Sequence, residues 1–182
     1  MNSIARWGLL ALLPLAACSS NPPTPVAAAT PPTVPAPKPA VAEGDRNFAA
    51  QAAASDQFEV QSSELALKHS GSAAVRKFAQ HMIEAHSKTS QDLAQIAQAK
   101  DMAFSPKLDP AQQSMLASLE KLHGAAFTRL YLHDQVAGHA MAATLFRNEA
   151  SEGSDPQLKA FARKTLPHIE HHLRMARLLG GR

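Results

Sequence analysis

The chain has little of several features that define common classes of protein. Its 182 residues include a single cysteine, Cys18, so no disulfide can form within one chain and no other thiol is available for catalysis. Aromatic residues make up only 5% of the chain, and the 18 basic residues are scattered among 15 acidic ones without a basic block. These absences argue against a disulfide-stapled domain, a cysteine enzyme and a nucleic-acid-binding protein.

Sequence motifs of several enzyme classes are also missing. There is no glycine-rich phosphate loop, no G-x-S-x-G elbow and no H-E-x-x-H zinc motif. A di-iron bundle enzyme needs Glu-x-x-His on two helices, whereas this chain has that spacing once, from Glu120 to His123. The sequence therefore favours a non-catalytic binding or structural module, with a ferritin-like metal-dependent oxidoreductase as the enzymatic alternative.

The N-terminus has the pattern of an export signal. Arg6 precedes an apolar run, Trp7 to Ala17, that contains a proline and is too short to span a bilayer. The run closes with Leu15-Ala16-Ala17-Cys18, which resembles the lipobox of bacterial lipoproteins. The resemblance implies removal of residues 1–17 and a lipid anchor on Cys18. Because Ser19 follows rather than Asp, we expect the protein at the periplasmic face of the outer membrane.

Residues 18–44 form a segment of distinct composition. Eight of the thirteen prolines lie between Pro22 and Pro39, and most of the other residues are alanine, threonine and valine. Such a segment lacks the apolar bulk to build a core and favours extended, polyproline-like conformations. We predict a disordered tether between the lipidated Cys18 and a folded domain that spans residues 45–182.

Residues 45–182 have the composition and periodicity of α-helices. Alanine, leucine, lysine and glutamine are frequent, and no alternating strand pattern occurs. Capping signals and glycines predict long helices over residues 45–69, 72–100, 124–151 and 156–179, and a short helix from Asp109-Pro110 to His123. Pro167 predicts a kink in the last helix.

The connections between the predicted helices indicate the topology. Tight turns at Gly71-Ser72 and Gly153-Ser154 join the four long helices into two hairpins, and a longer connection links the hairpins. We predict an all-α, ferritin-like four-helix bundle with an additional short helix in the crossover. A simple up-down bundle is the competing topology.

Three of the nine histidines, one on each of three long helices, lie at helical spacing from the apolar residues that we expect to face the core. They are His86, His139 and His172, and the first helix places Glu59 on its inward face. His168 lies one turn before His172 on the same face. We therefore predict a polar cluster inside the bundle, formed by Glu59, His86, His139 and His172 with His168 as an auxiliary member.

Buried groups of this kind must find partners. A transition metal such as Zn, Cu or Fe would satisfy imidazoles and a carboxylate together, which makes the five residues candidate metal ligands. A network of hydrogen-bonded side chains that fixes helix register is the structural alternative. A third alternative is a pH-responsive bundle, because the imidazoles gain a proton near neutral pH. A fourth is an envelope stress protein whose helical faces bind other envelope proteins.

The chain resembles a known family from about Phe48 to Leu179. The resemblance rests on these segments: Phe58-Glu59-Val60, Val75 to His86, Gly124 to Phe127, Tyr131-Leu132, His139, Ser154-Asp155-Pro156, Phe161-Ala162 and Leu166 to Leu173. The family is a bacterial domain of unknown function, often labelled as an outer membrane protein, and the resemblance implies a ferritin-like bundle and an envelope location. Its members usually have Asp before the histidine of the second and third helices, where this chain has Ala85 and Gly138.

Overall fold

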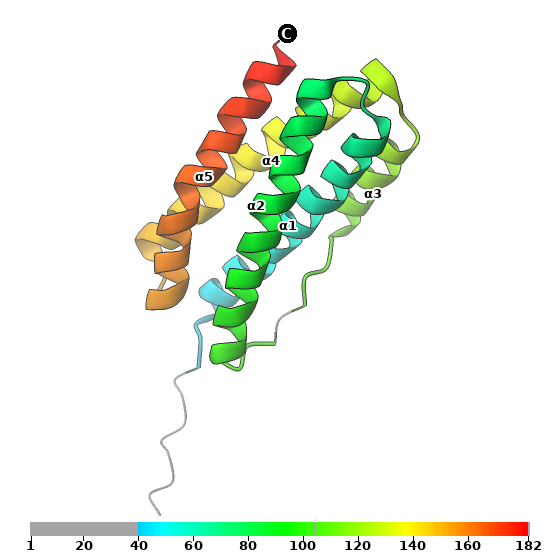
Figure 1. The fold of residues 1–182 in the computed structure, drawn as a ribbon. Coiled ribbons are helices and arrows are strands. Elements are labelled where there is room, and N and C mark those ends of the chain that lie inside the picture. The colour runs from blue at the N-terminus through cyan, green and yellow to red at the C-terminus, as the bar shows by residue number, and fades with distance from the viewer. Residues whose placement is uncertain (1–39, 104, 182) are drawn as a thin grey trace, which may run out of the picture. The chain divides into compact units, whose positions relative to one another are not determined.

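The regular structure of the chain is helical throughout the part described. The computed structural model describes residues 40–103 and 105–181 (Figure 1). Its helices are α1 (Glu43–His69), α2 (Ala73–Ala99), α3 (Pro110–Glu120), α4 (Gly124–Glu152) and α5 (Pro156–Gly180). Among these residues no helix is long and apolar enough to cross a membrane. The predicted signal peptide, Cys18 and most of the predicted tether lie outside the described residues.

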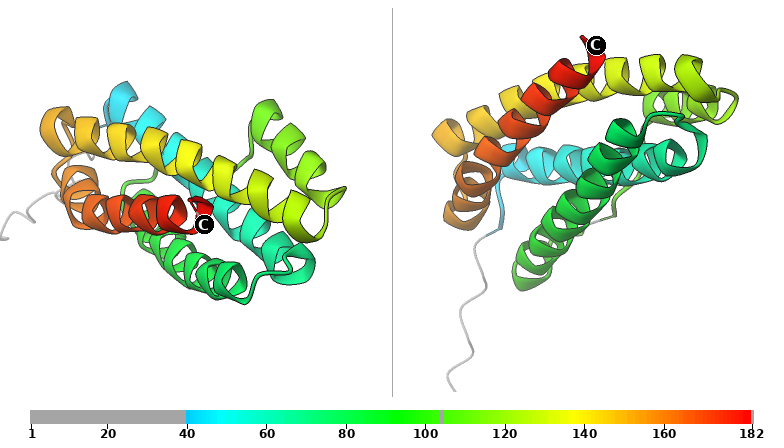
Figure 2. Two further views of the ribbon diagram at one scale, coloured as in Figure 1. Left: turned by 90° about the horizontal axis from the view of Figure 1, so that it is seen from above. Right: turned by 45° about the horizontal axis from the view of Figure 1, so that its top comes forward.

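The four long helices form two antiparallel hairpins, α1–α2 and α4–α5 (Figure 1, Figure 2). The connection between the hairpins carries α3, which packs against α1, and it returns the chain to the end of the bundle where α2 began. As a result α2 and α4 run in the same direction, as a single crossover requires. The predicted topology is therefore confirmed over the competing up-down arrangement.

Most helix ends lie where the capping residues predicted them. Ser72 caps α2 and accepts from the backbone N–H of Val75, and Asp109 forms a capping box with Gln112 at the start of α3. Asp155 caps α5 through two backbone N–H groups. The boundaries shift slightly elsewhere: α1 begins at Glu43 rather than residue 45, and α3 ends at Glu120 rather than His123.

Pro167 does not end the last helix. The α5 helix continues without interruption from Pro156 to Gly180 and includes Pro167. Proline deprives the carbonyl of Arg163, four residues earlier, of its helical donor. Both residues are exposed, so water can bind the carbonyl that proline leaves without a partner.

The apolar core is divided into two clusters along the bundle. One lies toward the α4–α5 turn and includes Phe48, Leu93, Phe146, Leu158 and Phe161. The other lies toward the α1–α2 turn and includes Val75, Phe78, Met82, Phe127 and Tyr131. The buried polar residues that carry the candidate site lie between these two clusters in the sequence of every long helix.

Candidate metal centre

Each of α2, α4 and α5 places one histidine between the two apolar clusters. His86 follows Met82 of one cluster and precedes Leu93 of the other, and His172 follows Ile169 and precedes Ala176 in the same way. His139 holds the corresponding position on α4. Because of their spacing along the helices, all three side chains point into the bundle. The antiparallel hairpins bring them to the same height along the bundle axis.

The three imidazoles meet at one point. One ligand nitrogen from each of His86, His139 and His172 lies within 4.8 Å of the others. Their ring centroids are 5.4–5.5 Å apart in every pair. The exposed fractions are 6%, 1% and 3%, so the cluster is closed to bulk water.

Each ring has a nitrogen without a hydrogen-bond partner among the described residues. These atoms are Nε2 of His86, Nε2 of His139 and Nδ1 of His172. A buried polar atom left unpaired costs about 1–3 kcal/mol, so three together are unfavourable for a purely structural cluster. Their convergence is what a metal ion needs from its ligands.

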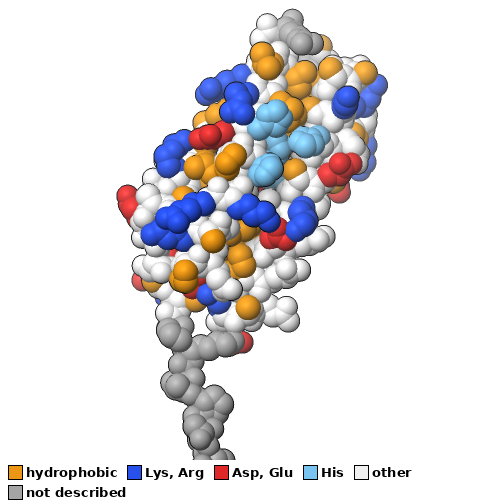
Figure 3. Space-filling view, turned by 60° about the vertical axis from the view of Figure 1, so that its left-hand side comes forward, with side chains coloured by type: hydrophobic (Ala, Val, Ile, Leu, Met, Phe, Trp, Pro, Cys, Tyr) orange, Lys and Arg blue, Asp and Glu red, His pale blue; other side chains and the backbone are white. Residues whose placement is uncertain are grey.

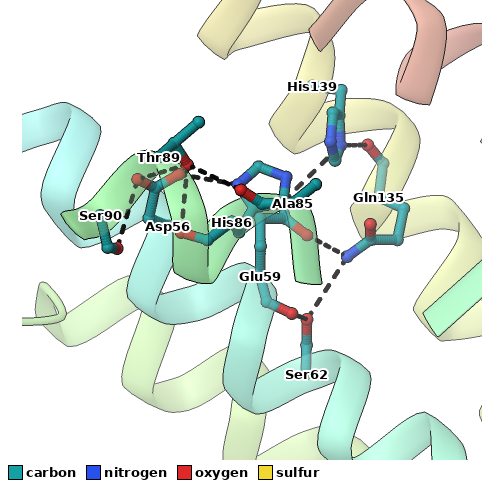
Figure 4. A network of polar contacts seen from close by, with 9 residues as sticks. All are labelled: Asp56, Glu59, Ser62, Ala85, His86, Thr89, Ser90, Gln135 and His139. Atoms are coloured by element: carbon teal, nitrogen blue, oxygen red, sulfur yellow. Dashed lines mark hydrogen bonds and ion pairs between the residues drawn. The ribbon is translucent and has the colours of Figure 1, made fainter. Parts of the chain in front are cut away.

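Asp56 on α1 orients His86. Its Oδ1 lies 2.7 Å from His86 Nδ1, and its Oδ2 accepts hydrogen bonds from Thr89 at 2.9 Å and Ser90 at 3.3 Å (Figure 4). Because the carboxylate binds the Nδ1–H, neutral His86 has its lone pair on Nε2, the unpaired atom. Carboxylates hold metal-binding histidines in this way, by fixing both the tautomer and the direction of the ring.

Gln135 orients His139 in an equivalent manner. Its backbone carbonyl lies 2.8 Å from His139 Nδ1 and can only accept, so Nδ1 carries the proton and Nε2 the lone pair. The Gln135 side-chain amide donates to Glu59 Oε2 and, at 3.3 Å, to Ser62 Oγ (Figure 4). Two of the three imidazoles are thus held with their free nitrogens available.

Glu59 and His168 take different places from the three histidines. Glu59 is buried beside the cluster, and its Oε1 lies 3.7 Å from Nδ1 of His139, the nitrogen turned away from the convergence. Burial raises the pKa of Glu59 from 4.5 to about 7. His168 is exposed and does not belong to the group of three. The structure therefore brings together His86, His139 and His172, with Glu59 as a neighbour.

Burial also sets the protonation of the cluster. Desolvation, followed by the positive charge on His86, lowers the pKa of His139 to about 3 and that of His172 to about 2. Desolvation acts in the same direction on His86, but the hydrogen bond and charge of Asp56 outweigh it and raise the pKa of that residue. His139 and His172 are therefore neutral at pH 7, the state in which imidazole binds a metal.

The chain lacks the family's usual Asp residues before the histidines of α2 and α4, and two carboxyl groups of α1 lie near these histidines. Ala85 and Gly138 stand before His86 and His139, whereas Asp56 and Glu59, three residues apart on α1, face the two imidazoles. A Cβ on Gly138 would lie 3.2 Å from Glu59 Oε1, so the glycine leaves room for that side chain. The carboxyl groups remain at the site although they come from another helix.

Several residues of the site were not predicted from the sequence. Asp56 shares a helix face with Glu59, and Gln135 precedes His139 by one turn, so phase alone could have found both. His81 and His171 are exposed, yet their rings lie 5.1 and 6.3 Å from the ring of His172. Glu120 and His123, the one Glu-x-x-His pair, are exposed at the end of α3 and contribute nothing to the buried cluster.

The fold and the buried histidines define the class as a ferritin-like helical bundle with a candidate metal centre. The chain belongs to the family described as a domain of unknown function, DUF4142, whose model matches residues 30–179. No curated protein matches it.

Solved structures support the fold. A DUF305 fragment from Deinococcus radiodurans superposes with a TM-score of 0.70 at 14% identity, covering 79% of this chain and 100% of that one. A DUF305 protein from Streptomyces coelicolor gives 0.63 at 16% identity, covering 73% and 89%. A dodecameric thioferritin, the bacterioferritin-related protein from Bacteroides fragilis, gives 0.58 at 20% identity, covering 75% and 84%. These likenesses confirm the predicted ferritin-like bundle.

Proposed function

We propose that this protein is a lipid-anchored component of the bacterial cell envelope whose helical bundle binds one transition-metal ion through His86, His139 and His172. The observation that carries the proposal is the convergence of three buried imidazoles, each of which also has a nitrogen without a partner within the described residues. The set of converging ligands contains no carboxylate of the kind that di-iron chemistry requires, so the proposed role is metal binding and not di-iron catalysis.

Charge balance favours a cation at this point. Asp56 and Glu59 are both buried beside the histidines of the cluster, Asp56 Oδ1 at 2.7 Å from His86 and Glu59 Oε1 at 3.7 Å from His139. A divalent ion held by three neutral imidazoles would place two positive charges beside these two carboxyl groups. Binding would also lower the pKa of Glu59, since a nearby cation favours the carboxylate.

The geometry needs only a small contraction to hold a metal. Bonds of about 2.0–2.1 Å from zinc to imidazole nitrogen place those nitrogens about 3.4 Å apart in a tetrahedral site. The nitrogens here lie within 4.8 Å of one another, so each would move toward their common centre by at most about 0.8 Å. Imidazole ligands suit Zn, Cu and Fe, and three of them leave a fourth position for water.

The envelope location rests on the sequence before the bundle. Leu15-Ala16-Ala17-Cys18 supports lipidation of Cys18, and the proline-rich residues 18–44 support a tether that separates the bundle from the membrane. The membrane of attachment is the outer membrane, at its periplasmic face, and other envelope proteins are the partners within reach. In this setting the bundle would bind metal in the periplasm, where thiol ligands are scarce.

The test of metal binding uses the full chain purified in detergent. The protein is stripped with a chelator, reloaded separately with Zn, Cu or Fe, and analysed for metal by mass spectrometry. We expect one ion per chain, and loss of that ion in the variant His86→Ala/His139→Ala and in the bulkier His86→Gln/His139→Gln.

The matched control is His123→Ala/His133→Ala, which removes two exposed histidines from elsewhere on the bundle. Circular dichroism verifies that all variants remain helical. Retention of a tight ion by the folded variants, or its absence from the wild-type protein, would refute the metal site. Retention of C18A in the membrane fraction would refute the anchor.

A further inference from the structure

Two exposed histidines contact the buried cluster from outside. The ring of His81 on α2 lies 5.1 Å from the ring of His172, perpendicular to it, and the ring of His171 on α5 lies 6.3 Å from it. His172 in turn lies 5.4 Å from His86 and 5.5 Å from His139. His172 therefore connects two surface imidazoles to two fully enclosed ones.

A cleft opens at the same place between α2 and α5. It has a volume of about 420 Å³, and His81 and His171 lie on its opposite walls, together with Phe78 and Met175. Figure 3 shows histidine side chains gathered in one patch on this face of the bundle. The cleft is thus a path from solvent toward the cluster, with imidazoles where it approaches His172.

From this arrangement we infer that His81 and His171 form the entry site for the metal ion, which passes from them to His172 and then to the buried cluster. The inference rests on the proposed function, since it assigns the route by which the same centre is filled. It gives the two surface histidines a role in the rate of loading and none in the final coordination.

The physical reason is the cost of moving a bare cation into the bundle. A divalent ion without ligands loses its hydration in an apolar interior, at a cost far larger than folding can supply. The centroids of successive rings lie only 5.1 and 5.4 Å apart, so neighbouring imidazoles are close enough for the next ring to bind the ion before the previous one releases it. The ion keeps nitrogen ligands at each step.

Another cleft lies on a different face and suits a cation less well. It has a volume of about 650 Å³, and its lining includes Arg129 and Arg177 beside His133. His133 bonds to Asp134 at 3.2 Å. Two guanidinium groups would repel a divalent ion more strongly than the single Lys77 ammonium group in the lining of the α2–α5 cleft. The α2–α5 cleft is the better route because its two histidines lie near the ring of His172.

The test measures uptake and final binding separately. Stripped full-length protein is mixed with Zn²⁺, and in parallel with Cu²⁺, each supplied on a coloured chelator, and transfer is followed by stopped-flow absorbance. We expect His81→Ala/His171→Ala to take up metal on the order of tenfold more slowly than wild type. Its final occupancy is expected to remain one ion per chain, with unchanged affinity.

The control is His123→Ala/His133→Ala, whose side chains are engaged elsewhere: His123 stacks on His69 and His133 bonds to Asp134. It should load at the wild-type rate. An unchanged rate in His81→Ala/His171→Ala would overturn the entry route while leaving the buried site intact. A lower final occupancy would overturn it as well, because the two residues would then be ligands. A wild-type protein that takes up neither ion would instead refute the proposed function.

Discussion

At the scale of single residues, Asp56 decides which nitrogen of His86 is free. Its carboxylate binds Nδ1 at 2.7 Å and is itself held by Thr89 and Ser90, so the ring has little freedom to turn. We predict that Asp56→Asn weakens metal affinity by about 10–100-fold, because the amide no longer holds the Nδ1–H tautomer with a full charge. Competition with a chelator of known affinity measures the change.

The control for this prediction is Asp92→Asn, which removes an acidic side chain of α2 that pairs with Lys88 near the surface. Its affinity should equal that of the wild-type protein. If Asp56→Asn also binds as tightly as wild type, the carboxylate does not orient the ligand and the description of the site must change.

The helical spacing of the residues predicted that the three histidines point into the bundle, but it did not predict which side chains surround them. His86, His139 and His172 each interrupt an apolar stripe, and a side chain in a stripe must point into the bundle. Phase does not give the depth of one helix relative to another, so it could not separate Glu59, which lies beside the cluster, from the converging ligands. Asp56 shares a helix face with Glu59, so phase could have placed it inside the bundle, but phase could not predict its pairing with His86 on another helix.

At the scale of elements, α1 holds the start of α5. Asp45 accepts hydrogen bonds from the backbone N–H groups of Ser154 and Asp155, both at 2.9 Å, across the α4–α5 turn. Lys100 at the end of α2 pairs with Asp155 at 2.6 Å. Three helices therefore meet at one turn through contacts that helix periodicity does not reveal.

Helix boundaries were predictable wherever a side chain makes the cap. Ser72, Asp109 and Asp155 all accept from backbone N–H groups of the first turn, as their positions predicted. The start of α1 was placed two residues late because its N-cap is Ala42, whose side chain can form no hydrogen bond. Gly124, with a φ of 58°, separates α3 from α4, which agrees with the break predicted there.

Glu149, near the end of α4, makes the same turn sensitive to pH. Burial, followed by the negative charges of Asp45 and Asp155, raises its pKa from 4.5 to about 7. Between pH 4.5 and 7 the unfolded chain has lost this proton while the folded chain retains it. Stability therefore falls as pH rises through that window, and the loss is complete above pH 7.

We predict that Glu149→Gln is more stable than wild type at pH 8 by about 1–2 kcal/mol, after discounting the shift for partial solvent screening. The difference should shrink toward zero at about pH 4, below the ordinary pKa of 4.5, where the carboxyl group is largely neutral in both the folded and the unfolded state. Urea unfolding at the two pH values measures it. Glu152→Gln, an exposed neighbour on α4, should show no such difference. An equal gain at both pH values would mean that packing, and not ionisation, is responsible.

At the scale of the whole molecule, the histidines form a polar layer that divides the core. Apolar clusters lie on both sides of it, and the layer draws residues from all four long helices: Asp56 and Glu59 on α1, then His86, His139 and His172. The sequence predicted the two hairpins and their crossover because turns and helix lengths are local properties. The level at which the helices cross depends on packing between them, which no local pattern contains.

The proposed ion would make the stability of the entire bundle depend on its binding to this layer. Without metal, three buried ring nitrogens lack hydrogen-bond partners among the described residues, whereas in the unfolded chain water satisfies them. Metal that binds only the folded state stabilises it by about 2.7 kcal/mol at a free concentration of 100 times Kd. For a domain of this size that corresponds to a rise in Tm of roughly 8 °C. Calorimetry of the stripped and reloaded protein should show this rise, and excess chelator should reverse it.

The variant His86→Ala/His139→Ala should melt at the same temperature with and without metal. If its Tm rises as much as that of the wild-type protein, the ion binds outside the layer.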